Sequence, residues 1–204
     1  MTIAVKRVFV LHSNTGVTAP TFTEASLATE GGRMDVVARS LISALYDTGR
    51  PRRDTLFIAV LHGPPTPPLA IYLRPWLQAE RKPSEREAGA HLLRVLKGAK
   101  AHASEVKREE TIEAVRSLKK LGYRIHLMLE RGDDIRGVRL EEGNVFVLGD
   151  HIGFPEEVQE ELESECDEVI SLGKVSYLAS HCILYLHEIL DRFEQFERYR
   201  APST

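Results

Sequence analysis

The chain has 204 residues, of which 43% are hydrophobic and 28% charged, with a formal net charge of −3. Its composition is ordinary for one globular domain. No apolar run reaches the roughly 18 residues of a membrane-spanning helix. The N-terminal apolar stretch has no small-residue cleavage site, so no signal peptide is predicted. The cysteines, Cys166 and Cys182, are too few for a disulfide framework, so we expect reduced thiols and a cytoplasmic protein.

Charge is distributed unevenly along this near-neutral chain. Lysine and arginine concentrate in the first two thirds, and acidic residues cluster between residues 156 and 168. Such segregation can give a protein a basic face. For each cluster taken singly, a solvated helix face is the simpler interpretation.

Apolar and β-branched runs predict strands at residues 6–11, 55–61, 69–73, 125–129, 145–148 and 169–172, and we expect a loop at 130–136. Apolar residues at helical spacing, with glycine and proline at their ends, predict helices at 34–46, 84–96, 112–121, from 155 onward and at 179–196. Because strands and helices alternate, we expect a single α/β domain with a largely parallel sheet.

Some stretches carry more specific signals. The segment 13–32 is rich in Thr, Ser, Ala and Gly, which predicts a long loop or lid. Prolines make the turn at 63–68 stiff and leave it few backbone donors. Ser84 with Glu87 three residues later predicts a capping box. The last helix is apolar beyond a narrow stripe, so it either packs centrally or forms a subunit interface.

Two glycine-bearing loops suggest a ligand site. One follows the strand at 145–148 and contains Gly149 and Gly153; the other follows the last strand and begins at Gly173. Glycine lets a backbone approach a ligand closely, and open α/β sheets bind ligands beyond the carboxyl ends of their strands. For the first loop, an ordinary strand-to-helix turn is an equally good interpretation.

Together the two loops predict a pocket walled by backbone amides and carbonyls, which suits adenine or adenosine. Neither loop matches the phosphate patterns G-x-x-x-x-G-K-[ST] or G-x-G-x-x-G, which disfavours an NTP or NAD. Cys182 follows the second loop, and by composition it is more simply a small buried apolar residue. The histidines show no paired spacing, so no metal site is predicted.

An arginine and an aspartate follow a glycine pair at the start of the first helix. Arg33 could bind a phosphate, and Asp35 could accept a proton or a hydrogen bond. For Asp35 alone, charge compensation at a helix N-terminus is the simpler explanation. The basic turn at 50–54 could contact an RNA backbone, or it could be a solvated loop.

A set of motifs in fixed order covers nearly the whole chain. They are G-R-M-D (32–35), R-R-D (52–54), H-G-P-P-x-P-P (62–68), G-D-D-I-R (132–136), V-F-V-L-G-D-H-x-G-F (145–154), I-S-L-G (170–173), L-A-S-H-C-I (178–183) and L-D-R (190–192). In this combination the sequence resembles the archaeal tRNA (pseudouridine-54-N1) methyltransferase (TrmY) family, which is of the SPOUT class.

The resemblance implies a SPOUT-type α/β fold, with a mostly parallel sheet flanked by helices and a C-terminal trefoil knot over about 125–196. It also implies S-adenosylmethionine held in the knot and a homodimer formed through the C-terminal helix. Carried over by position, the cofactor contacts are Leu127 or Leu129, Gly149, Leu172, Gly173, Lys174, Val175, Ser176, Tyr177 and Cys182. Residues 97–110 look like a local insertion or variable stretch.

The implied reaction is methyl transfer from S-adenosylmethionine to N1 of pseudouridine 54 in tRNA. N1 carries a proton that must leave, and Asp35 is the candidate acceptor or orienting group. Arg33 would hold the target phosphate or stabilise the developing base anion. Basic residues expected to contact the RNA backbone are Arg39, Arg52, Arg53, Arg81 and Lys82.

Three other interpretations are compatible with the sequence. One is a SPOUT methyltransferase that acts on an rRNA pseudouridine. Another is a non-catalytic module that binds S-adenosylmethionine or RNA. The third is an unrelated α/β nucleotide-binding enzyme, which the missing phosphate motifs disfavour.

Overall fold

The computed structural model describes residues 5–77, 81–99, 103–138, 140 and 143–200, except for the side chains of 195–200. Its strands are β1 (Arg7–Ser13), β2 (Thr55–Leu61), β3 (Leu69–Leu73), β4 (Ser104–Lys107), β5 (Arg124–Asp134), β6 (Asn144–Gly149) and β7 (Glu168–Ser171). Its helices are α1 (Met34–Leu45), α2 (Glu85–Leu96), α3 (Thr111–Lys120), α4 (Glu156–Glu165) and α5 (Ala179–Arg200), with a 3-10 turn at Ile135–Gly137. None of these helices has both the length and the apolar character needed to cross a membrane.

The strands form one seven-stranded sheet in the order β4-β3-β2-β1-β6-β5-β7. The strands from β2 to β7 in this order run parallel, whereas β3 and β4 are added antiparallel at the other edge. The carboxyl ends of the parallel strands therefore meet along one side of the sheet, where open α/β sheets bind their ligands.

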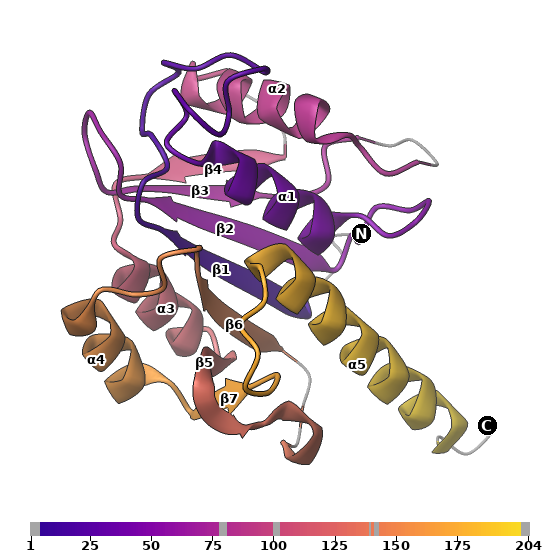
Figure 1. Ribbon diagram of the computed structural model, residues 1–204. Coiled ribbons are helices and arrows are strands. Elements are labelled where there is room, and N and C mark those ends of the chain that lie inside the picture. Colours follow the sequence, from indigo (N-terminus) through magenta and orange to yellow (C-terminus); the bar gives the residue numbers. More distant parts are fainter. Residues whose placement is uncertain (1–4, 78–80, 100–102, 139, 141–142, 201–204) are drawn as a thin grey trace.

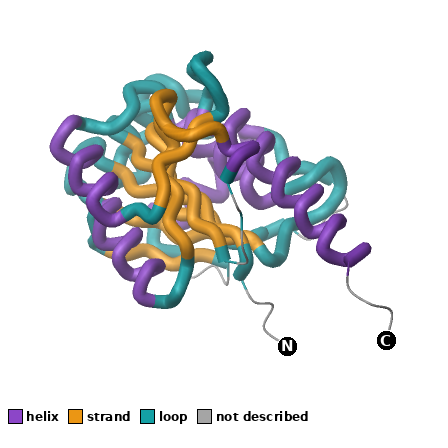
Figure 2. Tube along the Cα trace, turned by 90° about the horizontal axis from the view of Figure 1, so that it is seen from below, coloured by secondary structure: helices purple, strands orange, loops and turns teal. Residues whose placement is uncertain are grey.

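Helices cover both faces of the sheet, with α1, α2 and α5 on one face and α3 and α4 on the other (Figures 1 and 2). Alternation along β1 places Phe9 and Leu11 in the core beneath α1 and α5, and Val8 and Val10 in the core beneath α3 and α4. All four side chains are fully buried. Burial on both faces explains why β1 is continuously apolar in sequence.

The predicted alternation of strands and helices is confirmed, with small differences at the boundaries. The capping box is present: Ser84 Oγ accepts from the backbone N–H of Glu87 at 3.2 Å, and the Glu87 carboxylate accepts from the backbone N–H of Ser84 at 2.9 Å. Between β1 and α1, the expected long loop contains no helix or strand in the described residues.

Two strand segments were not predicted from the sequence. The stretch 97–110 contains β4, an exposed edge strand whose sequence Ser-Glu-Val-Lys carries little apolar signal and which forms by pairing with β3. β5 continues to Asp134, where a loop was expected from Glu130 onward. Its second half pairs with β7 beyond an irregularity between Met128 and Asp133, so a partner distant in sequence makes this segment a strand.

α5 packs beside α1 and is anchored near the amino ends of the parallel strands. Arg7 is buried at the start of β1 and donates to Asp191 at 2.6 Å, to Glu194 at 2.9 Å and to Nδ1 of His187 at 3.0 Å. Arg52 makes a bidentate ion pair with Asp191, at 3.0 and 2.8 Å. The R-R-D and L-D-R motifs, far apart in sequence, therefore meet in space.

Candidate active site

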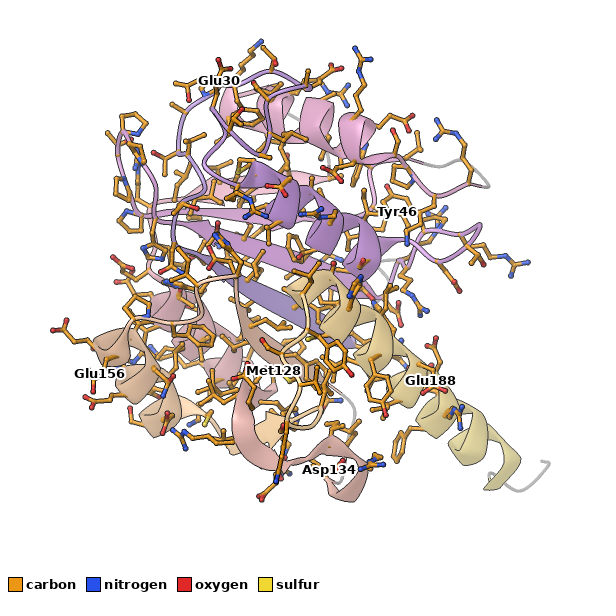
Figure 3. All side chains as sticks on the ribbon, in the orientation of Figure 1. Glu30, Tyr46, Met128, Asp134, Glu156 and Glu188 are labelled. Atoms are coloured by element: carbon orange, nitrogen blue, oxygen red, sulfur yellow. The ribbon has the colours of Figure 1, made fainter. Side chains whose placement is uncertain are left out.

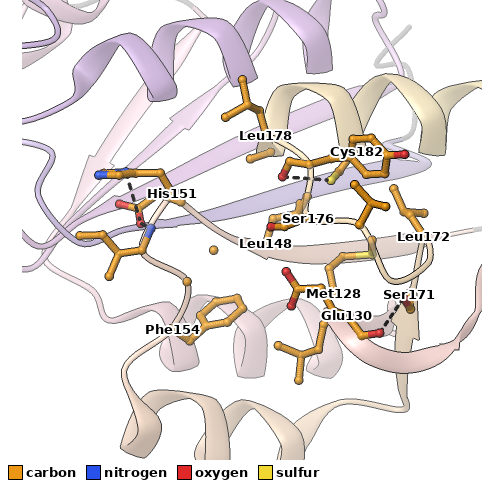
Figure 4. A pocket seen from close by; sticks show the side chains of 18 of the residues that line it. Met128, Glu130, Leu148, His151, Phe154, Ser171, Leu172, Ser176, Leu178 and Cys182 are labelled. Atoms are coloured by element: carbon orange, nitrogen blue, oxygen red, sulfur yellow. Dashed lines mark hydrogen bonds and ion pairs between the residues drawn. The ribbon is translucent and has the colours of Figure 1, made fainter.

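A cavity of about 520 Å³ opens at the carboxyl ends of β5, β6 and β7, against the first turns of α1 and α5. It is lined by 128–130, 148–154, 171–173 and 175–179, together with Val36, Gln159 and Cys182. Figure 4 shows Met128, Glu130 and Phe154 on one side of this cavity and Leu178 and Cys182 on the other. Its size is within the usual range of small-molecule sites.

Most of the residues predicted to contact a cofactor line this cavity. They are Leu129, Gly149, Leu172, Gly173, Val175, Ser176, Tyr177 and Cys182. Leu127 and Lys174 are not in the lining. Leu127 is fully buried inside the sheet, in the core beneath α3 and α4, and only Leu129 at the end of that run reaches the cavity. Lys174 is exposed in the loop before α5.

Several lining residues were missed by the sequence analysis. Met128 and Leu148 are strand neighbours of predicted contacts, and Glu130 lies in the segment expected to be a loop. These positions lie in or beside quoted motifs, so the motifs could have indicated them. Val36 and Gln159 enter the lining through the packing of α1 and α4, which no local pattern reveals.

The loop after β6 is held by the side chain of Asp150, which is 1% exposed. Its carboxylate accepts from the backbone N–H of Asn14 at 2.7 Å, from Asn14 Nδ2 at 2.8 Å and from the backbone N–H of Ile152 at 2.9 Å. A Cβ on Gly149 would lie 2.9 Å from Cα of Gly153. The two glycines therefore let the loop fold back closely on itself.

The loop after β7 is held in the same manner by a side chain at its start. Ser171 Oγ accepts from the backbone N–H of Gly173 at 2.9 Å and lies 3.1 Å from the carbonyl oxygen of Glu130, to which it donates. Gly173 has a φ of +119°, a conformation that side chains disfavour. β5 and the loop after β7 are therefore joined on one side of the cavity.

Cys182 lines the cavity from the first turn of α5. Burial raises the pKa of its thiol to about 11. The thiol is therefore protonated at neutral pH, and only a thiolate is a strong nucleophile. Cys182 acts here as a small apolar wall of the cavity, in agreement with the simpler interpretation of its sequence context.

Arg33 and Asp35 lie beside the cavity, at the start of α1. Asp35 is 5% exposed and accepts from Nε of Arg33 at 2.9 Å and from a guanidinium nitrogen of Arg39. Burial alone would raise the pKa of Asp35, but the ion pairs with Arg33 and Arg39 outweigh it and hold this pKa below its ordinary value. A carboxylate so stabilised is a weak proton acceptor, so this geometry suits an orienting role better.

The residues predicted to contact RNA are separated by the fold. Arg39 joins the Asp35 ion pairs near the cavity. Arg52 and Arg53 precede β2, at the amino ends of the parallel strands; Arg52 pairs with Asp191, whereas Arg53 is exposed. Arg81 pairs with Glu87 at the start of α2, and Lys82 beside it is exposed.

Two histidines lie at the ends of β1 and β2, on the other side of the Asp150 loop. The rings of His12 and His62 are 4.2 Å apart, and Nδ1 of His12 is 2.8 Å from Oγ1 of Thr111. Burial, with the neighbouring His62, lowers the pKa of His12 to about 4. Burial also lowers the pKa of His62 below its ordinary value, so the neutral form of both rings predominates at pH 7. Among the described residues, no group of three His, Cys, Asp or Glu side chains is placed to hold a metal ion.

A family model described as "Putative SAM-dependent RNA methyltransferase" matches residues 6–195. The tRNA (pseudouridine(54)-N(1))-methyltransferase of Methanococcus maripaludis is 33% identical over 91% of this chain and 98% of its own length. This chain belongs to that methyltransferase family. The enzymes of the same name from Thermococcus kodakarensis and Methanopyrus kandleri are each 32% identical, over 91% and 97% of this chain and 98% of each relative.

Among solved structures, that of Archaeoglobus fulgidus Nep1 bound to S-adenosylhomocysteine is similar, with a TM-score of 0.59. The match covers 95% of this chain and 100% of that one, at 19% sequence identity. At this sequence identity, the similarity shows that the two proteins share a fold.

Proposed function

We propose that this protein transfers a methyl group from S-adenosylmethionine to N1 of pseudouridine 54 in tRNA. Membership of the methyltransferase family, over nearly the full length of chain and relatives, carries the proposal. The cavity at the carboxyl ends of β5, β6 and β7 supports it, because most of the residues expected to contact the cofactor line that cavity.

The lining of the cavity fits S-adenosylmethionine chemically. Leu129, Leu148 and Leu172 offer apolar surface for an adenine ring, and the glycine loops expose backbone groups for its polar edge. Glu130 adds an exposed carboxylate that suits a cationic ligand. Bound there, S-adenosylmethionine supplies an electrophilic methyl group on a sulfonium. Cys182 stays neutral beside it and does not compete as a nucleophile.

The reaction at the acceptor base determines the roles that we assign to Arg33 and Asp35. In pseudouridine the ribose is attached at C5, so N1 carries a proton; methylation forms an N1–C bond, breaks the S–C bond and releases that proton. Negative charge develops on the base as the proton leaves. Asp35 orients Arg33 and Arg39, and we assign these cations to the target phosphate and the developing anion. Solvent accepts the proton, because the lowered pKa of Asp35 makes it a poor base.

Methyl transfer to matched tRNAs tests the proposed function. The purified protein is incubated with methyl-labelled S-adenosylmethionine and tRNA transcripts, with and without prior pseudouridylation at position 54. We expect label only in the pseudouridylated tRNA, at N1 of that base. Equal labelling of both tRNAs would contradict the proposal, as would label elsewhere or none at all.

The C-terminal region is proposed to form a trefoil knot over about 125–196, within one domain. Two observations support threading of the chain here: β5 pairs with β7 on both sides of its irregularity, and a Cβ on Gly132 would lie 2.5 Å from the Ile170 backbone. The segment after Met128 thus bends tightly over β7. A crystal structure traced continuously through 125–196 tests the knot; α5 lying outside the loop formed by β5 to β6 would refute it.

We also propose a homodimer formed through the outer face of α5. Leu184 and Tyr185 of α5 are each 43% exposed and Phe193 is 37% exposed, so this helix carries exposed apolar surface. Figure 3 labels Glu188, which lies on the side of this helix that faces away from the sheet. Light scattering should give a dimer mass for the native protein and a monomer mass for Tyr185→Glu. A monomeric native protein would exclude this interface.

A further inference from the structure

The turn at residues 14–16 links the two halves of the candidate active site. It follows β1 directly and begins the loop that leads to α1. On one side it contacts the Asp150 loop, which lines the cofactor cavity. On the other side it contacts Gly32, next to Arg33, in the loop end that starts α1.

Toward the cavity, Asn14 makes three hydrogen bonds. Its backbone N–H and its Nδ2 donate to the Asp150 carboxylate at 2.7 and 2.8 Å, and Nδ2 also donates to the carbonyl oxygen of Gly153 at 2.8 Å. The Asp150 side chain is 1% exposed, so these bonds are shielded from water. Buried charge-assisted bonds of this kind are strong, and Asn14 thereby fixes the loop between Gly149 and Gly153.

Toward α1, Thr15 is joined to Gly32. Thr15 Oγ1 donates to the carbonyl oxygen of Gly32 at 2.7 Å. Gly32 has a φ of +58°, and any Cβ on it would overlap the carbonyl oxygen of Thr15. The next residue, Arg33, also has a positive φ, of +68°. A backbone held in this unfavourable conformation requires support from its surroundings, and Thr15 provides it.

A third contact holds the turn from the side of β2. A Cβ on Gly63 would overlap the carbonyl oxygens of Thr15 and Gly16. The backbone N–H of Gly63 donates to the carbonyl oxygen of Gly16 at 2.9 Å. The glycines of the G-R-M-D and H-G-P-P motifs therefore share one purpose, which is to let the backbone at 14–16 pass between them.

We propose that Asn14 and Thr15 are positioning residues that set the distance between the methyl-donor cavity and the Arg33–Asp35 pair. The inference rests on the function proposed above. Asn14 fixes the cavity loop, and Thr15 fixes the segment that carries Arg33. Because transfer requires donor and acceptor atoms in near contact, a misplacement of about 1 Å can reduce the rate on the order of 100-fold.

Three variants and one control test the two arms of the turn separately. Thr15→Val removes the hydroxyl while keeping the shape, and Thr15→Ser keeps the hydroxyl. Asn14→Ala removes the bonds from Nδ2 to Asp150 and Gly153. Thr23→Val is the control, because Thr23 is exposed in the same loop and its hydroxyl contacts only Ser26 and the chain beside it.

The expected results differ between the two arms. For Thr15→Val we expect kcat for tRNA methylation to fall about 10- to 100-fold, with unchanged affinity for S-adenosylhomocysteine in calorimetry. Thr15→Ser should restore kcat, and Thr23→Val should match the native protein. Asn14→Ala should weaken S-adenosylhomocysteine binding about 10-fold, the cost of lost bonds to a buried charge. Thermal unfolding of each variant shows whether it is folded.

Three outcomes would overturn the inference. They are equal kcat for Thr15→Val and Thr15→Ser, native cofactor affinity in folded Asn14→Ala, and parallel loss of kcat and affinity in both variants. Thr15→Ser that fails to fold would also count against it, because the hydroxyl alone is proposed to matter. If the native protein binds S-adenosylhomocysteine but methylates no tRNA, the proposed function fails instead, and the Asn14 arm remains measurable by calorimetry.

Discussion

The two ends of the parallel sheet use charged side chains in opposite ways. At the amino ends, Arg7 and Arg52 are paired with Asp191 and Glu194 and hold α5 against the start of β1 and the turn before β2. At the carboxyl ends, Glu130 and the Arg33–Asp35 pair border an open cavity of about 520 Å³. The charged pairs at the amino ends stabilise the packing of the chain. The charged groups at the carboxyl ends are positioned to contact a ligand.

This difference shows how similar residue pairs can have different purposes. Arg52–Asp191 joins two elements far apart in sequence, whereas Arg33–Asp35 joins two residues of one turn. The first pair stabilises the packing of α5, and the second adds little to packing and fixes the direction of a guanidinium. Substitutions at the amino end should therefore change stability, and those at the carboxyl end should change binding and catalysis.

The largest effect is expected from Arg7→Met, at the amino end. Removing the buried Arg7 cation leaves Glu194 without this ion pair and leaves Asp191 paired with Arg52 alone, which costs about 3 kcal/mol or more. Urea unfolding of the variant measures this loss. At a temperature where the variant is folded, calorimetry should give native affinity for S-adenosylhomocysteine. A 10-fold weaker affinity in the folded variant would show that the amino end of the sheet also contributes to cofactor binding.

The next effect is expected from Asp35→Asn, at the carboxyl end. Loss of the carboxylate frees Arg33 and Arg39 from their orientation, so kcat should fall roughly 100-fold, a loss of transition-state stabilisation of about 2.7 kcal/mol. Affinity for S-adenosylhomocysteine should stay within about twofold of native, since Asp35 is outside the cavity lining. Full turnover in Asp35→Asn would remove this residue from the mechanism.

Acidic pH should weaken the fold through a buried histidine at each end. Burial lowers the pKa of His12 to about 4, and burial with the charges of Arg52 and Arg7 lowers that of His187 to about 3. In the unfolded chain each binds a proton near pH 6.5, so this stability is complete above that pH and is lost as pH falls below it. We expect about 1–2 kcal/mol lost per histidine between pH 7 and pH 5.

Urea unfolding at the two pH values, repeated on histidine variants, measures this loss. The pH difference should shrink in His12→Gln and in His187→Gln, and should persist in His181→Gln, whose ring is exposed. Only His12→Gln should also change cofactor affinity, because His12 adjoins Phe154 of the cavity lining. An unchanged pH difference in both buried-site variants would show that other groups cause the acid sensitivity.

The smallest effects separate the adjacent residues Arg52 and Arg53. Arg53→Ala should reduce the salt dependence of tRNA binding by about one released counterion. Arg52→Ala should leave that slope unchanged and lower stability by about 1 kcal/mol, because its guanidinium is engaged with Asp191. Filter binding over a range of salt concentrations measures the slopes. Equal slopes for the two variants would remove Arg53 from the RNA contacts.

The sequence was sufficient where local rules determine structure. The helix from Ser84 followed from its capping box and apolar spacing, and the cavity loops followed from their glycines. It was insufficient where a distant partner decides. β4 exists because β3 pairs with it, and the second half of β5 because β7 does. Similarly, no local sequence pattern shows that Arg52 forms an ion pair with Asp191.

The role of Asn14 was missed for the same reason. It lies in a polar loop that is unremarkable in composition, and its importance arises only when Asp150 is brought against it from a position 136 residues further on. By contrast, Asp35 was singled out from the sequence, but the direction of its pKa could not be predicted. Burial raises this pKa, and the ion pairs with Arg33 and with Arg39, one helical turn further on, outweigh burial and lower it.

α5 is one continuous helix that extends from the carboxyl ends of the parallel strands to their amino ends. Its first turn borders the cavity through Ala179 and Cys182, and its fourth turn carries Asp191. A helix unfolds and refolds cooperatively along its length. We therefore expect a ligand bound in the cavity at one end to protect backbone amides at the other end from hydrogen exchange. A ligand at a concentration of 100 times its Kd raises the free energy of any local unfolding that disrupts its binding site by about 2.7 kcal/mol. Slower hydrogen exchange around Asp191 would thus report a molecule bound at the opposite edge of the protein.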